Sequence, residues 1–270
     1  MSEQNALNTP PMLEARGVCK YFGGLKAVDQ VDMRIMPGDV FGIIGPNGAG
    51  KTTFFNLCTG IYLPTKGQIF CRGEDITGLS AEAVAGKRIA RTFQNLQLFK
   101  FMTVLENVKA GCHIKTKSNM FDAVVHTRRW REDEVYTTEK SLEILKRVGL
   151  YDVRDILAGN LSYGMQRKVE IARALALDPI ILLLDEPAAG MNPLETQNLM
   201  TYISDINKDG HTIAVIEHDM KFIMSACNRI LVLNFGHKIF EGNPAEVKAN
   251  TEVQTAYFGK AMTAREAARA

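Results

Sequence analysis

The sequence predicts an α/β fold with a mainly parallel sheet, and three observations support this class. Short apolar runs at 40–44, 180–184 and 212–216 are typical of strands that are buried on both faces. Segments with helical periodicity or helix-capping residues lie between the runs. From residue 162 onward, helices and strands alternate, and this order builds a parallel sheet covered by helices.

The first hundred residues contain further strand signals. Val31, Met33 and Ile35 alternate with charged residues, which predicts a half-buried strand. The buried run at 40–44 follows directly after a Pro-Gly turn. Another strand is expected at 68–72. This part of the chain is therefore rich in strands.

The middle of the chain, roughly 96–160, has a different character. Leu142, Leu145 and Val148 share one helical face, and charged residues gather in the sequence before them. We interpret this region as a mostly helical insertion with a solvated face.

The remaining elements follow in order. One helical face comprises Met165, Val169, Ala172 and Leu175. Asn192 supplies an N-cap for the next helix, which Gly210 is expected to end. The segments 230–233 and 238–240 flank Gly236 and predict a hairpin.

Composition and charge exclude several classes of protein. Hydrophobic residues make up 46% and charged residues 23% of the 270, as in globular domains. A formal net charge of +2 disfavours a dedicated nucleic-acid binder. The longest apolar run, 180–184, is too short to span a bilayer, and residues 1–10 lack the features of a secretion signal. The five cysteines are widely spaced, which favours reduced thiols over a disulfide framework.

A glycine-rich loop follows the strand expected at 40–44 and precedes a helix expected at 52–60. It matches the phosphate-binding pattern GxxxxGK[ST] in full. Glycines let backbone N–H groups turn towards a phosphate, and the helix N-terminus adds partial positive charge. Lys51 is expected to reach the β- and γ-phosphates, and Thr52 to hold Mg²⁺. The candidate nucleotide-binding residues are Gly45, Pro46, Asn47, Gly48, Ala49, Gly50, Lys51, Thr52 and Thr53.

Two carboxylates, Asp185 and Glu186, follow directly after the apolar run at 180–184. This position places both at the carboxyl edge of the sheet, where open α/β sheets bind ligands. Asp185 is expected to support Mg²⁺, directly or through water, and Glu186 to polarise a water in line with the γ-phosphate. Alone, the pair could be solvated residues at a strand end. Together with the loop upstream, it indicates nucleotide hydrolysis.

GTP is disfavoured as the nucleotide. A guanine-reading Asn-Lys-x-Asp element is absent, and the nearest stretch, 207–210, has its aspartate one position too early. We interpret that stretch as the turn that ends a helix.

The segment 161–167, Leu-Ser-Tyr-Gly-Met-Gln-Arg, resembles the LSGGQ signature of ATP-binding cassette (ABC) ATPases. Ser162 and Gly164 match the signature, whereas Tyr163 and Met165 replace its first glycine and its glutamine. The resemblance implies that this segment contacts a nucleotide held by the loop of an opposite subunit. Ser162 is equally suited to be an ordinary helix N-cap.

Four further positions match the family. Gln94 resembles the Q-loop glutamine that senses Mg²⁺ and water, and His218 the switch histidine that contacts the γ-phosphate. Phe22 resembles the aromatic residue that stacks on adenine, with Tyr21 as the alternative. Asn192 occupies the D-loop position, where a helix cap is an equally good interpretation.

The resemblance also implies fold, cofactors and organisation. It implies a P-loop NTPase fold of the ABC type with an antiparallel β subdomain and a helical insertion at about 96–175. It implies one ABC ATPase domain over 12–259, with an N-terminal extension at 1–11 and a tail at 260–270. The implied cofactors are ATP and Mg²⁺.

Several segments resemble, more narrowly, the ATPase subunits of branched-chain amino acid importers. They are 22–25, 91–95, 162–164, 189–193 and 256–259. This implies a second ABC ATPase subunit and two transmembrane permease subunits as partners, with a periplasmic substrate-binding protein acting indirectly. It also implies a peripheral location on the cytoplasmic side of the inner membrane. No nucleic-acid partner is expected.

Other functions remain open from sequence alone. The ATPase of lipopolysaccharide export shares much of the motif set, although 243–259 favours the importer. A soluble ABC ATPase acting on DNA or ribosomes would usually carry a long coiled-coil insertion or two cassettes, and neither is evident. A purely regulatory nucleotide-binding protein would not need Glu186.

Overall fold

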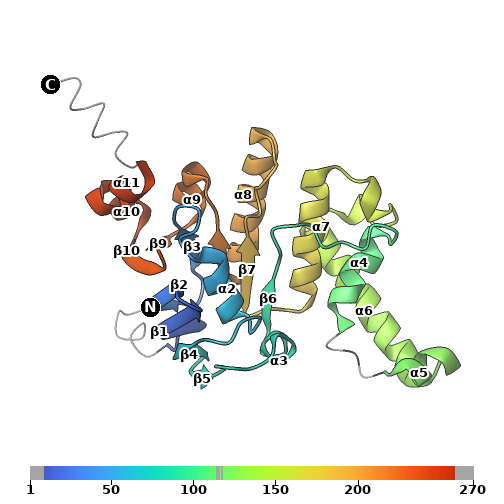
Figure 1. The fold of residues 1–270 in the computed structure, drawn as a ribbon. Helices are drawn as coiled ribbons and strands as arrows, with labels where there is room; N and C mark the ends of the chain where they lie inside the picture. Colours follow the sequence, from blue (N-terminus) through green and yellow to red (C-terminus); the bar gives the residue numbers. More distant parts are fainter. Residues whose placement is uncertain (1–8, 114–115, 117, 259–270) are drawn as a thin grey trace.

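The computed structural model describes residues 9–113, 116 and 118–258 (Figure 1). Most of the expected N-terminal extension and all of the expected tail at 260–270 lie outside these residues. Within the described residues, two sheets and the helices around them form the fold. No helix among them has both the length and the apolar character needed to cross a bilayer.

The larger sheet contains the buried strands that the sequence predicts. Its strands run in the order β10-β9-β3-β8-β7-β6, and all neighbours are parallel except β9 and β10. The strands are β3 (Val40–Ile44), β6 (Ile89–Arg91), β7 (Ile181–Asp185), β8 (Thr212–Ile216), β9 (Arg229–Asn234) and β10 (His237–Gly242). The predicted α/β class is confirmed.

The smaller sheet is antiparallel and has the order β2-β1-β4-β5. Its strands are β1 (Leu13–Phe22), β2 (Leu25–Ile35), β4 (Lys66–Cys71) and β5 (Glu74–Asp75). The resemblance implied such a unit. The alternation at 31–35 predicted the second half of β2, and the strand expected at 68–72 overlaps β4. No sequence pattern predicted β1, which has register shifts against β2 and lacks regular alternation.

Helices cover the sheets and extend to one side. They are α2 (Lys51–Cys58), α3 (Ala81–Gly86), α4 (Val104–Gly111), α5 (Met120–Val125), α6 (Arg128–Arg147), α7 (Tyr163–Ala176), α8 (Pro193–Lys208), α9 (Met220–Ala226), α10 (Pro244–Ala249) and α11 (Thr251–Phe258). The chain from α4 to α7 connects β6 to β7, with α5 far from the sheets (Figure 1). The segment 96–103 is not helical, so the helices of the expected insertion begin only at Val104.

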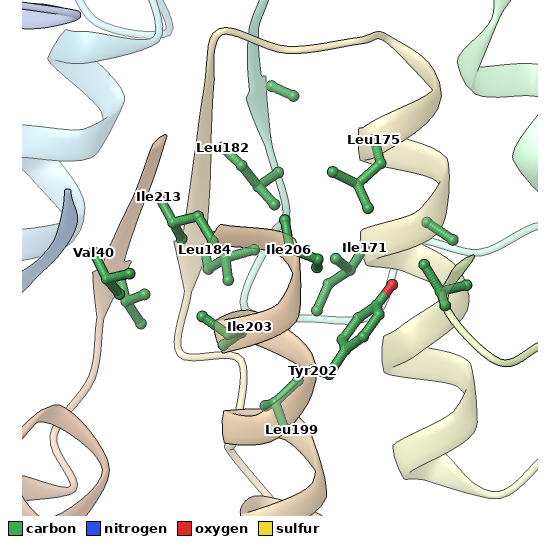
Figure 2. Close-up of a cluster of buried hydrophobic side chains, with 14 of the residues drawn as sticks. Val40, Ile171, Leu175, Leu182, Leu184, Leu199, Tyr202, Ile203, Ile206 and Ile213 are labelled. Atoms are coloured by element: carbon green, nitrogen blue, oxygen red, sulfur yellow. The ribbon is translucent and has the colours of Figure 1, made fainter. Parts of the chain in front are cut away.

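The core lies on both faces of the larger sheet. Alternate residues such as Ile43 and Leu183 face the smaller sheet and α2. Their neighbours, such as Leu184 and Ile213, face the helices, where Ile203 of α8 packs against them (Figure 2). Burial on both faces explains why these strands are uninterrupted apolar runs in the sequence. Polar residues predicted to bind nucleotide lie at or just after the carboxyl ends of β3, β7 and β8, where these buried apolar strands end.

Candidate nucleotide-binding site

The loop between β3 and α2 has a backbone conformation that requires glycine. Gly50 has a φ of 97°, and a Cβ at this residue would lie 2.3 Å from the carbonyl oxygen of Ala27. The N–H of Ala49 donates to the Pro46 carbonyl at 3.1 Å. The carbonyl of Ala49 in turn accepts from the N–H of Gly236, also at 3.1 Å. The loop therefore has a fixed shape that larger residues would not permit.

The N-terminus of α2 is suited to bind an anion. Its N-cap is Gly50, which has no side chain to accept from the first-turn N–H groups, and the first turn contains no acidic residue. Those N–H groups have no partners within the helix, and they carry its partial positive charge. A phosphate group would accept hydrogen bonds from these N–H groups and would neutralise the partial positive charge.

Lys51 lies at the start of α2 and is buried. Its Nζ donates to the carbonyl oxygens of Gly45, at 2.7 Å, and Pro46, at 3.1 Å. Burial lowers the pKa of Lys51, and the nearby charges of Glu186 and Asp185 oppose that effect. The lysine is thus held over the loop, where a phosphate would lie.

A hollow of about 520 Å³ brings most of the predicted nucleotide-binding residues together. Its lining includes Phe22, Asn47, Gly48, Ala49, Gly50, Lys51, Thr52, Thr53, Glu186 and, unforeseen from the sequence, Phe235 of the β9–β10 turn. The hydroxyl of Tyr21 instead donates to Asp29 at 2.7 Å. The geometry therefore favours Phe22, which is 42% exposed, over Tyr21 as the aromatic residue available to a base.

Asp185 is the last residue of β7 and is buried against Arg91 of β6. The two side chains are 2% and 7% exposed, and Nη2 of Arg91 lies 2.7 Å from Oδ2 of Asp185. Arg91 also donates to Asn56 at 2.7 Å and to Thr59 at 3.1 Å. The sequence analysis did not assign Arg91 a role. Oδ1 of Asp185 is buried with no hydrogen-bond partner among the described residues, so an oxygen ligand remains available to a hard cation such as Mg²⁺.

Glu186, Gln94 and His218 converge although they are far apart in the chain. Nε2 of Gln94 donates to Oε2 of Glu186 at 2.9 Å. Nδ1 of His218 lies 3.9 Å from the same oxygen. Glu186 has a φ of 45°, a left-handed conformation that is rare for residues other than glycine and that tends to occur at functional sites.

A second carboxylate, Glu217, lies with its Oε2 3.7 Å from Nδ1 of His218, and the sequence did not predict it. It is buried, and it accepts hydrogen bonds from the N–H groups of Ala188 at 2.8 Å and His218 at 3.2 Å. Burial raises the pKa of Glu217. No sequence motif marks Glu217, because its hydrogen bond from Ala188 forms only where the end of β8 meets the segment after β7.

Ser162, Gly164 and Asn192 do not line the hollow. Ser162 is the N-cap of α7, with its Oγ accepting from the Met165 N–H at 3.4 Å. Asn192 forms a capping box with Glu195 at the start of α8. Ser162 and Asn192 therefore both act as helix N-caps, as one of the two interpretations of each residue predicted. Any contact of these residues with a nucleotide must involve one bound elsewhere than in this hollow.

The fixed glycine loop, the free helix N-terminus and the carboxylates at the sheet edge define a P-loop nucleotide-binding protein. Sequence comparison extends this conclusion. Residues 28–189 match the family described as ABC transporter. Residues 237–262 match the family described as branched-chain amino acid ATP-binding cassette transporter.

Two similar relatives carry the name high-affinity branched-chain amino acid transport ATP-binding protein. LivG of Escherichia coli is 41% identical over 93% of this chain and 99% of its own length. BraF of Pseudomonas aeruginosa is 42% identical over the same shares.

Solved structures agree with this result. An ATP-binding cassette of an ABC transporter in its ADP conformation has a TM-score of 0.81 and 32% identity, covering 93% of this chain and all of its own. A dimeric cassette bound to ADP and phosphate has a TM-score of 0.71 and 28% identity, covering 86% of this chain and 99% of its own. The chain belongs to the ABC transporter family, as one of its ATP-binding, ATP-hydrolysing subunits.

Proposed function

We propose that this chain hydrolyses ATP with Mg²⁺ to drive the uptake of branched-chain amino acids through membrane permease subunits. The observation that carries the hydrolytic role is the meeting of Gln94, Glu186 and His218 beside the phosphate-binding loop. The choice of substrate is supported by the match at 237–262 and by the names of the relatives. The proposed cassette is one domain over 12–259.

Binding follows from the loop. The N–H groups at the start of α2 and the ammonium of Lys51 bind the phosphates, while Phe22 offers its ring to the base. Thr52 and the unpartnered Oδ1 of Asp185 would supply oxygen ligands for Mg²⁺. When bound, the ion neutralises charge on the phosphate oxygens.

Hydrolysis requires a water held in line with the γ-phosphate. Glu186 accepts a proton from that water or orients it, and Gln94 fixes the carboxylate through its 2.9 Å hydrogen bond. His218, whose Nδ1 lies 3.9 Å from the same carboxylate oxygen, can donate to the γ-phosphate oxygens. The three side chains thus act together on one water and the γ-phosphate.

A second cassette completes each site. Ser162 is the N-cap of α7, Gly164 lies in its first turn, and Asn192 is the N-cap of α8; none of the three lines the hollow of its own chain. In a pair of cassettes they would contact the nucleotide bound to the opposite loop. The dimeric organisation of a similar cassette supports this arrangement. ATP then favours the closed pair because both surfaces bind one triphosphate, and hydrolysis removes that bridge.

The membrane subunits would dock near Gln94. A groove of about 600 Å³ lies between the sheets and the helical side of the molecule, and the exposed rings of Phe93 and Phe99 line it together with Ile61. Exposed apolar side chains in a groove are typical of a protein interface. Docking there would place the chain on the cytoplasmic side of the inner membrane. A periplasmic binding protein would act without touching it.

An uptake experiment tests this proposal. Cells lacking this chain are compared with cells that express it or its Lys51→Ala variant, using leucine, isoleucine, valine and an unrelated solute. We expect only the unsubstituted chain to restore uptake of the three amino acids, with no effect on the unrelated solute. Unchanged uptake of all three in the deleted cells would contradict the substrate assignment.

A further inference from the structure

A buried ion pair connects α7 to the loop that carries Gln94. Nη1 of Arg167 lies 2.7 Å from Oε2 of Glu170, one turn further along α7, and both side chains are essentially inaccessible to solvent. Two buried charges are costly unless their remaining donors and acceptors are satisfied. Nε of Arg167 is buried without a hydrogen-bond partner among the described residues, but other donors and acceptors of the pair do have partners, and these show what the pair does.

Those partners are backbone groups of the Gln94 loop. Arg167 donates from Nη1 to the carbonyl of Phe93 at 2.8 Å and from Nη2 to the carbonyl of Gln94 at 2.9 Å. Oε1 of Glu170 accepts from the N–H of Gln97 at 3.2 Å. The pair therefore holds the loop on both sides of Gln94, whose own side chain reaches Glu186.

Tyr163, which replaces a glycine of the signature, is the third member of this cluster. Nη2 of Arg167 donates to its hydroxyl at 3.3 Å, and its ring lies 5.9 Å from the guanidinium carbon. The same ring covers Gly190, where an added Cβ would lie 3.7 Å from it. Tyr163 thus contacts the segment after Glu186 and the residue that holds the Gln94 loop.

We propose that Tyr163, Arg167 and Glu170 form a clamp that positions Gln94 against Glu186, an inference that rests on the proposed ATPase function. The three are positioning residues, since they act through Gln94. The clamp also ties the start of α7, where Ser162 lies, to the hydrolytic residues of the same chain. A shift of α7 upon contact with the opposite nucleotide then moves Gln94.

The test is a double-mutant cycle on the full chain, assayed with the subunits that co-purify with it. Tyr163→Phe keeps the ring over Gly190 and removes the hydroxyl that Arg167 contacts. We expect kcat for ATP to fall about three- to tenfold, the change that corresponds to the loss of one ordinary hydrogen bond, with KM changed by less than about twofold. In a Gln94→Ala background the same substitution should change kcat by less than about twofold.

Two further variants sharpen the result. Glu170→Gln should lower kcat in the same direction and likewise lose its effect in the Gln94→Ala background. Tyr136→Phe, which removes a hydroxyl from an exposed tyrosine of α6, should leave kcat unchanged.

The outcomes separate the two proposals. Wild-type kcat in both clamp variants, or effects that multiply with that of Gln94→Ala, would overturn the clamp and leave the ATPase assignment intact. Failure of the unsubstituted complex to hydrolyse ATP would refute the proposed function, and the clamp with it.

Discussion

Replacing Arg91 by alanine should strongly destabilise the fold, because it leaves Asp185 buried without its partner. The two side chains are only 7% and 2% exposed, so solvent cannot take over the role of the guanidinium. Breaking a buried pair from one side costs about 3–5 kcal/mol in free energy of unfolding. We expect a lower denaturation midpoint in urea and a melting temperature lower by roughly 10 °C.

A matched control lies three residues earlier in the chain. Arg88 pairs with Asp178 at 2.8 Å, but those side chains are 45% and 42% exposed. Arg88→Ala should therefore cost only about 0–1 kcal/mol. In the Arg91→Ala background, Asp185→Asn should recover part of the loss, since it removes the stranded charge. Equal costs for the two arginine substitutions, or no recovery, would refute this reasoning.

Three further predictions concern the nucleotide and pH. Lys51→Ala should abolish tight ATP binding, since the phosphates lose their compact cation; calorimetry showing wild-type affinity would remove Lys51 from this role. Glu186→Gln should keep ATP binding but reduce phosphate release by about a hundredfold or more, and near-normal turnover would count against Glu186. The raised pKa of Glu217 means that the folded state binds this proton more tightly than the unfolded state does. The wild-type fold therefore loses stability as the pH rises above the pKa that Glu217 has in the unfolded chain. Glu217→Gln should therefore gain stability relative to wild type as the pH rises above the ordinary glutamate pKa; a stability difference that does not change with pH would contradict this assignment.

Continuous motifs account for most of what the sequence predicted correctly. The strand, glycine loop and helix around Lys51 are adjacent in the chain, so local patterns were sufficient to predict them. The double-sided burial of β7 and β8 was likewise visible as uninterrupted apolar runs. The structure brings Gln94, Glu186 and His218 together, and their roles in hydrolysis stay predictions until tested.

What the sequence missed depends on contacts between distant segments. Arg91 belongs to β6, a strand of three residues whose only pairing among the described strands is with β7, and its ionic partner lies 94 positions away. Glu217 gains its partners only when the segments after β7 and β8 meet. Tyr163 replaces a glycine of the signature, and its function cannot be inferred without its neighbours in the fold, Arg167 and Gly190. Local patterning cannot show such relations.

The hydrogen bonds at Gly236 affect how the phosphate loop meets its ligand. Because the N–H of Gly236 holds the Ala49 carbonyl and its own carbonyl accepts from Asp29, the turn before β10 braces the loop from outside. The loop's conformational entropy is consequently lost during folding and not when nucleotide arrives. A chain that kept every nucleotide-binding motif but lacked the turn at Gly236 would have a more flexible phosphate-binding loop and a weaker affinity for nucleotide. Inspection of the motifs alone would not reveal this loss.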